Sequence, residues 1–253
     1  MDFSLEGKVA LITGGSRGIG EATALGFARA GADVVVASRK LPDLERVAEL
    51  VKGLGRKSLA ISAHIGKLDA ISNLVAEVKE KFGKIDILVN NAGTSPIYSP
   101  LMDYEERGWD TVLNLNLKGL VFLSQAVARV MKEHGGGSII NVASMDGYKP
   151  EPNIGPYAIS KAGAIMATKV MALEWAQYNI RVNAIAPGNV RTRLGDSRFE
   201  VVPELQDEML KRTPLGRIAQ PEEMVGTMIY LASDASSFTT GETIIVDGGL
   251  LLT

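Results

Sequence analysis

Short apolar runs alternate with longer segments of helical composition along the whole chain. The runs are continuous rather than alternating with polar residues, which is typical of strands buried on both faces. We expect strands at 8–13, 33–37, 57–63, 85–90, 138–143, 180–186 and 243–247. We expect helices at 18–30, 41–53, 68–82, 103–132, 156–178 and 221–232. This alternation predicts an α/β fold, with a doubly wound, parallel, seven-stranded sheet and helices on both faces.

The chain shows no linker, repeat or low-complexity tract, so its 253 residues are expected to form a single domain, 1–253. The longest stretch without a clear element is 187–215, which contains Pro187, Pro203 and Pro214. A connection of that length in a compact domain is usually functional or disordered. We therefore expect a substrate lid at about 189–213.

Composition narrows the function classes. The 27 basic and 29 acidic residues nearly balance, which speaks against partners such as nucleic acid or an anionic membrane. There is no cysteine and there are only two histidines, His64 and His134, so we expect no disulfide, no zinc cluster and no metal site. The first residues do not resemble a signal peptide, and no apolar run is expected to approach a membrane span. The expected location is cytoplasmic.

A glycine-rich turn joins the first predicted strand to the first predicted helix. Gly14, Gly18 and Gly20 have the spacing G-x-x-x-G-x-G rather than the G-x-G-x-x-G of the standard dinucleotide fingerprint. Glycines let the main chain approach a pyrophosphate closely, and the amides that open a helix favour an anion. The alternative is a tight connection with no ligand. The strand before the turn and the second strand after the helix favour a Rossmann-type dinucleotide site.

The end of the second predicted strand bears on the choice of cofactor. In a dinucleotide fold an acidic residue there binds the ribose 2′-hydroxyl of NAD, whereas arginine accommodates the 2′-phosphate of NADP. Here the strand ends in Ser38-Arg39-Lys40, without an acid. Arg39 supplies charge-assisted hydrogen bonds, and Arg17 in the glycine turn can face the same phosphate. We predict NADP, with NAD possible. The alternative is that Arg39 and Lys40 are solvated charges.

Further motifs give the chain a resemblance to the classical short-chain dehydrogenase/reductase family over essentially its whole length. They are Thr13–Gly20, Asn90-Asn-Ala-Gly93, Asn116-Leu-Lys-Gly119, Ser144, Tyr157-Ala-Ile-Ser-Lys161, Pro187-Gly188 with Thr192, and Asp247-Gly-Gly249. The resemblance implies the catalytic residues Asn116, Ser144, Tyr157 and Lys161. The cofactor-binding residues expected from motifs and resemblance are Gly14, Ser16, Arg17, Gly18, Ile19, Gly20, Arg39, His64, Ile65, Asn91, Gly93, Tyr157, Lys161, Pro187, Val190 and Thr192.

One position departs from the family pattern. The family usually has Asp at the end of the third strand, bonded to the adenine amine, and here that position is His64. A neutral imidazole offers one donor and one acceptor, so the ring itself can contact adenine. The alternative is that His64 only lines the adenine pocket and its backbone makes the contact.

Tyr157 and Lys161 are four residues apart in a segment opened by Pro156, so on a helix their side chains share one face. A nearby ammonium favours the phenolate form of tyrosine, which makes Tyr157 a candidate general acid in reduction and base in oxidation. Ser144 follows an apolar strand, at the sheet edge where α/β folds bind ligands. The resemblance makes it the donor to the substrate oxygen and makes Asn116 the holder of a water near Lys161. Taken alone, a Tyr-x-x-x-Lys pair on a helix is more often a surface feature than a catalytic one. Without Tyr157 downstream, Ser144 would be better explained as a serine that caps a turn.

The sequence indicates less about the substrate pocket. We expect pocket walls at 94–100, at 145–148 and on the lid, with Tyr98, Met145, Tyr148 and Leu194 as apolar candidates, although these residues could equally be packing. Arg191, Arg193 and Arg198 could meet an acidic substrate or the cofactor phosphates, or form a solvated charged loop. Reductases of carrier-bound acyl groups resemble the chain but usually carry two arginines where it has Glu133 and Leu173.

We expect an oxidoreductase that interconverts a ketone and a secondary alcohol with NADP(H). Within the family, the alternatives are an NAD-dependent alcohol dehydrogenase and a 3-oxoacyl thioester reductase. Outside it, they are a serine hydrolase, because 14–18 formally fits G-x-S-x-G at Ser16, and a regulator that binds NADP(H) without turnover. The family also implies a homotetramer, built through 103–132, 156–178 and an apolar C-terminal segment, 250–253.

Overall fold

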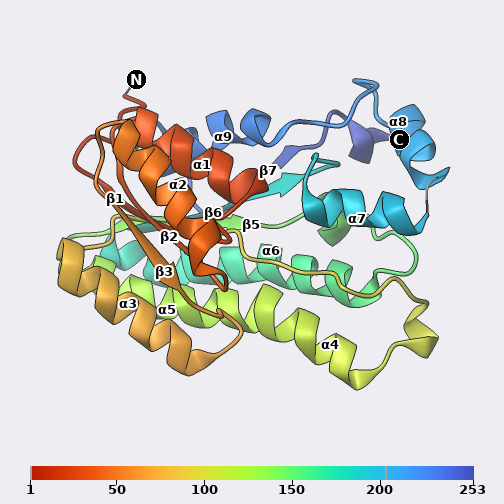
Figure 1. The fold of residues 1–253 in the computed structure, drawn as a ribbon, viewed down its shortest axis with the longest axis horizontal. Coiled ribbons are helices and arrows are strands. Elements are labelled where there is room, and N and C mark those ends of the chain that lie inside the picture. Colours follow the sequence, from red (N-terminus) through yellow and green to blue (C-terminus); the bar gives the residue numbers. More distant parts are fainter. Residues whose placement is uncertain (1, 203) are drawn as a thin grey trace.

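The computed structural model describes residues 2–202 and 204–253, without the side chains of residues 197–200. Seven parallel strands form one sheet in the order β3-β2-β1-β4-β5-β6-β7 (Figure 1). Their bounds are Val9–Thr13 (β1), Asp33–Ser38 (β2), Ser58–Ser62 (β3), Ile87–Asn90 (β4), Gly137–Val142 (β5), Ile180–Pro187 (β6) and Thr243–Val246 (β7). The predicted seven-stranded, doubly wound α/β fold is confirmed.

Helices cover both faces of this sheet, with α1, α2 and α9 on one side and α3 to α6 on the other (Figure 1). Their bounds are Gly18–Arg29 (α1), Leu41–Gly53 (α2), Leu68–Phe82 (α3), Glu106–Leu113 (α4), Leu120–Glu133 (α5), Gly155–Trp175 (α6), Arg193–Val201 (α7), Glu204–Arg212 (α8) and Val225–Ala232 (α9). Short 3-10 turns cover 101–103, 145–147, 176–178, 221–224, 234–236 and 250–252.

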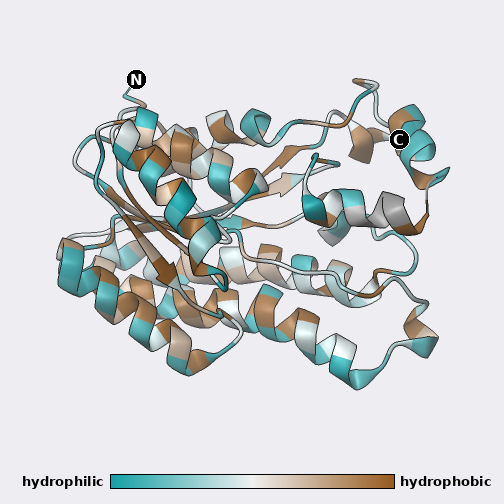
Figure 2. Ribbon diagram, viewed as in Figure 1, coloured by the Kyte–Doolittle hydropathy of each residue, from teal (hydrophilic) through white to brown (hydrophobic). Residues whose placement is uncertain are grey.

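The two-sided burial explains why the strands read as continuous apolar runs. Leu11 and Val35 belong to the core between the sheet and α3, α5 and α6, whereas Ile12 and Val36 belong to the core on the opposite face, beneath α1, α2 and α9. Each strand therefore needs apolar side chains in both directions. Figure 2 shows this as apolar strands enclosed by helices whose outer surfaces are hydrophilic.

The sheet order reverses next to β1, which pairs with β2 on one side and with β4 on the other. Connections leave in opposite directions there, so the ends of these strands open onto a crevice, as in other doubly wound folds. The glycine turn follows β1, and the segment beginning at Asn91 follows β4. The fold thus places the two motifs together at the carboxyl edge of the sheet.

The long helix expected at 103–132 is interrupted. Between α4 and α5, residues Asn114–Gly119 form a turn of π-helix, and the helical segment begins at Glu106. Such wider turns are rare and are often found at functional sites. The segment Glu106–Glu133 is long and apolar enough, by length and composition alone, to cross a membrane, so the expectation that no such run exists is wrong. Core helices of soluble proteins meet the same criterion, and 44% of the apolar window is buried.

The predicted lid contains two helices where no element was expected. α7 and α8 lie at the right of Figure 1, beyond the carboxyl edge of the sheet. Leu205 and Met209 of α8 are buried against Met145 and Leu250, so tertiary packing holds this polar helix. Arg212, the last residue of α8, also pairs with Glu151 at 3.0 Å.

Candidate active site

The glycine turn forms an open cradle in front of α1. Gly14 and Gly18 have φ values of +63° and +56°, in the left-handed region that favours glycine. A Cβ atom on Gly14 would lie 2.7 Å from Nδ2 of Asn91, so no larger residue fits there. Arg17 precedes the helix in extended conformation, and no side chain caps the first turn of α1. The opening amides of α1 therefore suit a phosphate, as the motif predicts.

Asn91 holds this cradle in place from the end of β4. Its Nδ2 donates to the carbonyl oxygens of Thr13 and Gly14, at 3.0 and 3.1 Å. Its backbone N–H donates to Oγ1 of Thr13 at 3.1 Å. The neighbouring Asn90 is buried and donates to Ser124 and Asn141. The Asn-Asn pair thus joins β1, β4, β5 and α5 at the point where the cleft opens.

The end of β2 places Arg39 on the wall of the cleft, without a carboxylate partner among the described residues. His64, after β3, lies on the same wall, and its Nδ1 accepts a hydrogen bond from the backbone N–H of Gly66 at 3.1 Å. A neutral ring with this bond carries its proton on Nε2. A contact between this ring and adenine stays a prediction.

Tyr157 and Lys161 lie near the start of α6, which places both on the cleft wall. Lys161 is buried; its Nζ donates to the carbonyl of Val142 at 2.7 Å and lies 5.5 Å from the centroid of the Tyr157 ring. Burial lowers the pKa of Lys161 to about 8, because water no longer stabilises the ammonium, and the negative charge of Asp146 partly opposes this shift. The four-residue spacing has produced the predicted proximity.

Ser144 follows β5 and opens the turn at 145–147. Its Oγ donates to Oδ2 of Asp146 at 3.0 Å and accepts from the backbone N–H of Asp146 at 3.1 Å. Asp146 is buried, and sequence reasoning did not select it. The only available signal was an acidic residue two positions after Ser144, which in an isolated sequence reads as a turn.

Asn116 lies in the π-helical turn, and its buried amide is fully engaged. Its Oδ1 accepts from the backbone N–H of Thr94 at 2.8 Å, and its Nδ2 donates to the carbonyl of Thr94 and to Oγ of Ser160. These bonds offset the cost of an amide inside an apolar helix. They also fix the segment after Gly93 beside α6.

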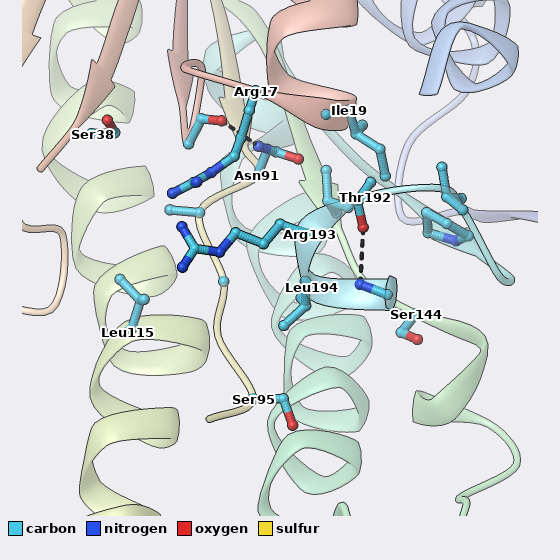
Figure 3. Close-up of a pocket in the computed structure, with 18 of the residues that line it drawn as sticks. Arg17, Ile19, Ser38, Asn91, Ser95, Leu115, Ser144, Thr192, Arg193 and Leu194 are labelled. Carbon is cyan, nitrogen blue, oxygen red and sulfur yellow. Dashed lines mark hydrogen bonds between the residues drawn. The ribbon is translucent and has the colours of Figure 1, made fainter. Parts of the chain in front are cut away.

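The segment after β6 forms the wall opposite α6. The N–H of Gly188 donates to Val246 of β7, and Val190 forms a short bridge with Ala219. Oγ1 of Thr192 accepts from the backbone N–H of Gly195 at 3.0 Å, which closes the first turn of α7 (Figure 3). The predicted lid segment, 189–213, therefore leaves the sheet from a fixed base.

One cleft brings most of the predicted residues together. Its wall includes Gly14, Ser16, Arg17, Gly18, Ile19, Arg39, His64, Ile65, Asn91, Gly93, Ser144, Tyr157, Lys161, Pro187, Val190 and Thr192 (Figure 3 labels several of them). Gly20 and Asn116 lie behind the wall. A Cβ atom on Gly20 would come 2.3 Å from the carbonyl oxygen of Gly14, so this glycine allows α1 to approach the turn.

The substrate end of the cleft differs from expectation. Leu194 lines it, but Met145 is buried in the cluster beneath α8 and therefore serves packing. Ser95 belongs to the wall expected at 94–100 and lines the cleft. Ile154 also lines it without having been predicted, because nothing distinguished it from other loop residues. Arg193 lines the cleft and Arg191 does not, while the side chain of Arg198 lies outside the described residues.

These residues fit a dinucleotide. The cradle offers glycines and uncapped amides for a pyrophosphate, and the described wall carries five cations and no carboxylate. At the other end, a hydroxyl, a phenol and a buried amine converge at the carboxyl ends of the strands, as proton exchange with a bound substrate requires. Ser16, by contrast, makes no hydrogen bond to either histidine among the described residues, so a serine hydrolase site is not assembled.

Comparison with known proteins supports this assignment. A family model described as enoyl-(acyl carrier protein) reductase matches residues 14–251. The chain is 43% identical to 2-dehydro-3-deoxy-D-gluconate 5-dehydrogenase of Escherichia coli, over 98% of the chain and 97% of that protein. It is also 43% identical to a 3-oxoacyl-[acyl-carrier-protein] reductase of Thermotoga maritima, over 98% of the chain and 99% of that protein.

Among solved structures, a gluconate 5-dehydrogenase from Burkholderia cenocepacia in complex with NADP and tartrate matches with a TM-score of 0.95 and 38% identity. The match covers 100% of the chain and 98% of that structure. Sequence, fold and site geometry agree, and they set aside the serine hydrolase and the non-catalytic regulator. The chain therefore belongs to the short-chain dehydrogenase/reductase family and is an NAD(P)-dependent oxidoreductase that acts on CH–OH groups.

Proposed function

We propose that the protein interconverts a ketone and a secondary alcohol with NADP(H) as its cofactor. The observation that carries the proposal is one cleft with two chemically distinct ends. Ser144, Tyr157 and Lys161 line it after β5 and at the start of α6, whereas Arg17 and Arg39 line it after β1 and β2, on the other side of β4 in the sheet order. The first set suits proton exchange at an oxygen, and the second suits a cofactor with an additional phosphate.

The nicotinamide, when bound, supplies or accepts the hydride. In reduction, the Tyr157 hydroxyl gives a proton to the substrate oxygen; in oxidation, its phenolate takes the proton back. The Lys161 ammonium favours the phenolate by its charge, since its Nζ lies 5.5 Å from the ring centroid. The Ser144 hydroxyl turns from Asp146 to the substrate oxygen and stabilises the negative charge that develops there.

Asn116 does not line the cleft but supports the residues that hold Lys161 in place. Its Oδ1 accepts from the backbone N–H of Thr94, and its Nδ2 donates to the carbonyl of Thr94 and to Oγ of Ser160. A Cβ atom on Gly93 would lie 3.6 Å from both Asn116 Oδ1 and Lys161 Nζ. We assign Asn116 the role of fixing the Gly93–Thr94 segment beside Lys161. This arrangement keeps the lysine in its buried position next to the phenol.

Removal of the Tyr157 hydroxyl tests the catalytic assignment. Tyr157→Phe should lower kcat by about 100-fold or more, because general acid-base catalysis supplies that much, while NADPH still binds. Steady-state kinetics and NADPH fluorescence measure the two effects. Tyr178→Phe, beyond the other end of α6, is the matched control and should remain active. Substantial turnover by Tyr157→Phe would refute the assigned role.

A charge reversal at the end of β2 tests the choice of cofactor. Arg39→Asp should weaken NADPH binding by about tenfold or more and leave NADH binding unchanged or improved, because a carboxylate repels the 2′-phosphate and accepts from the ribose hydroxyl. Dissociation constants for both cofactors measure the effect, with Arg129→Asp on the exposed surface of α5 as the control. An unchanged preference would mean that Arg39 does not face the phosphate.

The substrate is proposed to be a free small molecule rather than a carrier-bound thioester. Glu133 is exposed and pairs with Lys79 at 2.6 Å, and Leu173 is an exposed apolar residue; carrier-dependent relatives usually show arginines at these two positions. A panel of ketones, keto sugar acids, steroids and 3-oxoacyl thioesters, tested with both cofactors, identifies the class. Preference for a carrier-bound thioester over its free analogue would contradict this proposal.

Three further features stay proposals. We propose that 1–253 is a single domain, that 189–213 acts as the substrate lid, and that the protein works in the cytoplasm as a homotetramer. The exposed apolar side chains of α6 support this assembly. Cell fractionation tests the location.

A further inference from the structure

A lid arginine reaches into the cofactor end of the cleft. Arg193 is the first residue of α7, and its side chain lines the cleft. In Figure 3 the side chain runs from α7 toward the part of the cleft into which Arg17 also projects, and it points away from Ser144. It therefore faces the glycine-turn end of the site rather than the end where the substrate oxygen is handled.

Nothing on the described wall neutralises this pair of guanidinium groups. The charged residues of the wall are Arg17, Arg39, Lys40, Lys161 and Arg193, and none is acidic. Arg193 makes no ion pair among the described residues, whereas Arg191, two positions earlier, pairs with Asp196 at 3.2 Å and does not line the cleft. The positive charges in the cleft repel each other. An anion bound between Arg17 and Arg193 would attract both guanidinium groups and offset this repulsion.

We propose that Arg193 is a phosphate ligand of the bound dinucleotide, donated by the lid opposite the glycine turn. This inference rests on the proposed use of a dinucleotide cofactor. The phosphate is either part of the pyrophosphate or the 2′-phosphate of the adenosine ribose, and the guanidinium fork suits both. Arg17 binds from the fixed turn after β1, and Arg193 binds from the segment after β6.

The position of Arg193 gives this contact a second effect. The next residue, Leu194, lines the cleft, and Arg193 begins the helix that carries it. A phosphate held by Arg193 therefore fixes the start of α7, including the apolar wall at Leu194. Arg193 acts as a positioning residue toward the substrate and as a ligand toward the cofactor.

The test compares Arg193→Ala with Arg193→Lys and with the matched control Arg191→Ala. Dissociation constants for NADPH and NADH are measured by titration of cofactor fluorescence without substrate, at low and high salt. Arg193→Ala should weaken NADPH binding by about tenfold, the range expected for a lost hydrogen bond to a charged group, and the loss should shrink as salt rises. Arg193→Lys should recover part of the affinity, and Arg191→Ala should remain within about twofold of the wild type.

The two cofactors distinguish the source of the phosphate. An equal loss for NADPH and NADH supports a pyrophosphate contact, and a loss for NADPH alone supports a 2′-phosphate contact. The proposal is overturned if the dissociation constants of Arg193→Ala for both cofactors match those of Arg191→Ala. This holds also if the KM of Arg193→Ala for substrate rises while its cofactor binding stays unchanged. That last result would assign Arg193 to an acidic substrate instead.

Failure of the Arg193 contact can be distinguished from failure of the proposed NADP preference. If Arg39→Asp shifts the cofactor preference but Arg193→Ala changes nothing, only the present inference fails. If the wild type binds NADH and NADPH equally and Arg193→Ala weakens both, the NADP preference fails and the phosphate contact stands. Thermal melting of each variant checks that the exposed substitutions leave the fold intact.

Discussion

Lys161 keeps a cationic group inside the protein. The side chain is only 4% exposed, and the loss of hydration outweighs the favourable charge of Asp146, so its pKa falls from 10.5 to about 8. Its Nζ donates a hydrogen bond to the carbonyl of Val142. The folded protein thus holds this proton less tightly than the unfolded chain does. Burial of Lys161 therefore lowers the free energy of unfolding, as is common for residues at reactive positions.

This difference predicts a specific pH dependence of stability. Between about pH 8 and pH 10.5 the unfolded chain binds a proton at Lys161 that the folded protein has lost, so the folded state gains stability as the pH rises. Relative to Lys161→Met, the free energy of unfolding of the wild type should rise by about 3 kcal/mol across that window, at about 1.4 kcal/mol per pKa unit. Urea denaturation at several pH values measures it; a pH-independent difference between the two proteins would contradict the prediction.

Individual residues differed in how far the sequence revealed them. The spacing of Tyr157 and Lys161 was sufficient to predict that their side chains lie close together, because a helix brings residues four apart onto one face. Asp146 was not recognisable, since its burial depends on how the turn after β5 packs against α6 and the lid, segments distant in sequence. The bonds of Asn116 were hidden for the same reason, because its partner Thr94 lies 22 residues away.

Among the elements, α1 owes its position to the glycines before and within it. Gly20 lies against the carbonyl of Gly14 so closely that a single methyl group would require the backbone to shift. This contact brings the opening amides of α1 to the edge of the cleft. The third glycine of the motif therefore serves the approach of helix and turn, whereas Gly14 and Gly18 supply the left-handed backbone.

A pair of glycine substitutions tests this role. Gly20→Ala should lower the melting temperature and weaken NADPH binding, because the new Cβ meets backbone atoms. Gly226→Ala, within α9, has open space around its Cβ position and should be neutral or stabilise by about 0.5–1 kcal/mol, the usual gain from alanine in a helix. Thermal melting with and without NADPH measures both. Equal behaviour of the two variants would show that the close contact at Gly20 is unimportant.

The sequence predicted the strands and most helices because their apolar residues are continuous or periodic. It did not predict α7 and α8, whose composition is polar and which follow or flank prolines. Leu205 and Met209 of α8 gain their partners only when Met145 and Leu250 are brought together by the fold. The π-helical turn at 114–119 was equally invisible, since its residues fit an ordinary helical pattern.

At the scale of the whole molecule, α6 presents an unusually apolar outer surface. Ile159, Met166, Val170 and Leu173 are exposed on this helix, Leu173 by 84%, and they recur at helical spacing. Exposed apolar surfaces of this kind mark association sites. The C-terminal segment contributes less than expected, because Leu250 is buried within its own chain beneath α8, although Leu252 is exposed.

Association through α6 predicts the effect of a charge at Leu173. If the protein is the proposed tetramer, Leu173→Glu should shift it to a dimer, because burial of an unpaired carboxylate opposes the contact. Light scattering coupled to gel filtration measures the mass, and Leu54→Glu, at an exposed apolar position after α2, is the control. A wild-type monomer at micromolar concentration would rule out the assembly.

The single sign of charge on the cleft wall has a practical consequence for handling the protein. Among the residues that the structure describes, the cleft wall carries five cationic side chains and no carboxylate. By charge alone, such a pocket does not distinguish a cofactor phosphate from other small polyvalent anions. Phosphate, sulfate and citrate buffers should therefore act as competitive inhibitors toward NADPH, and Michaelis constants measured in them should be inflated. Assays in a zwitterionic buffer at constant ionic strength avoid this artefact.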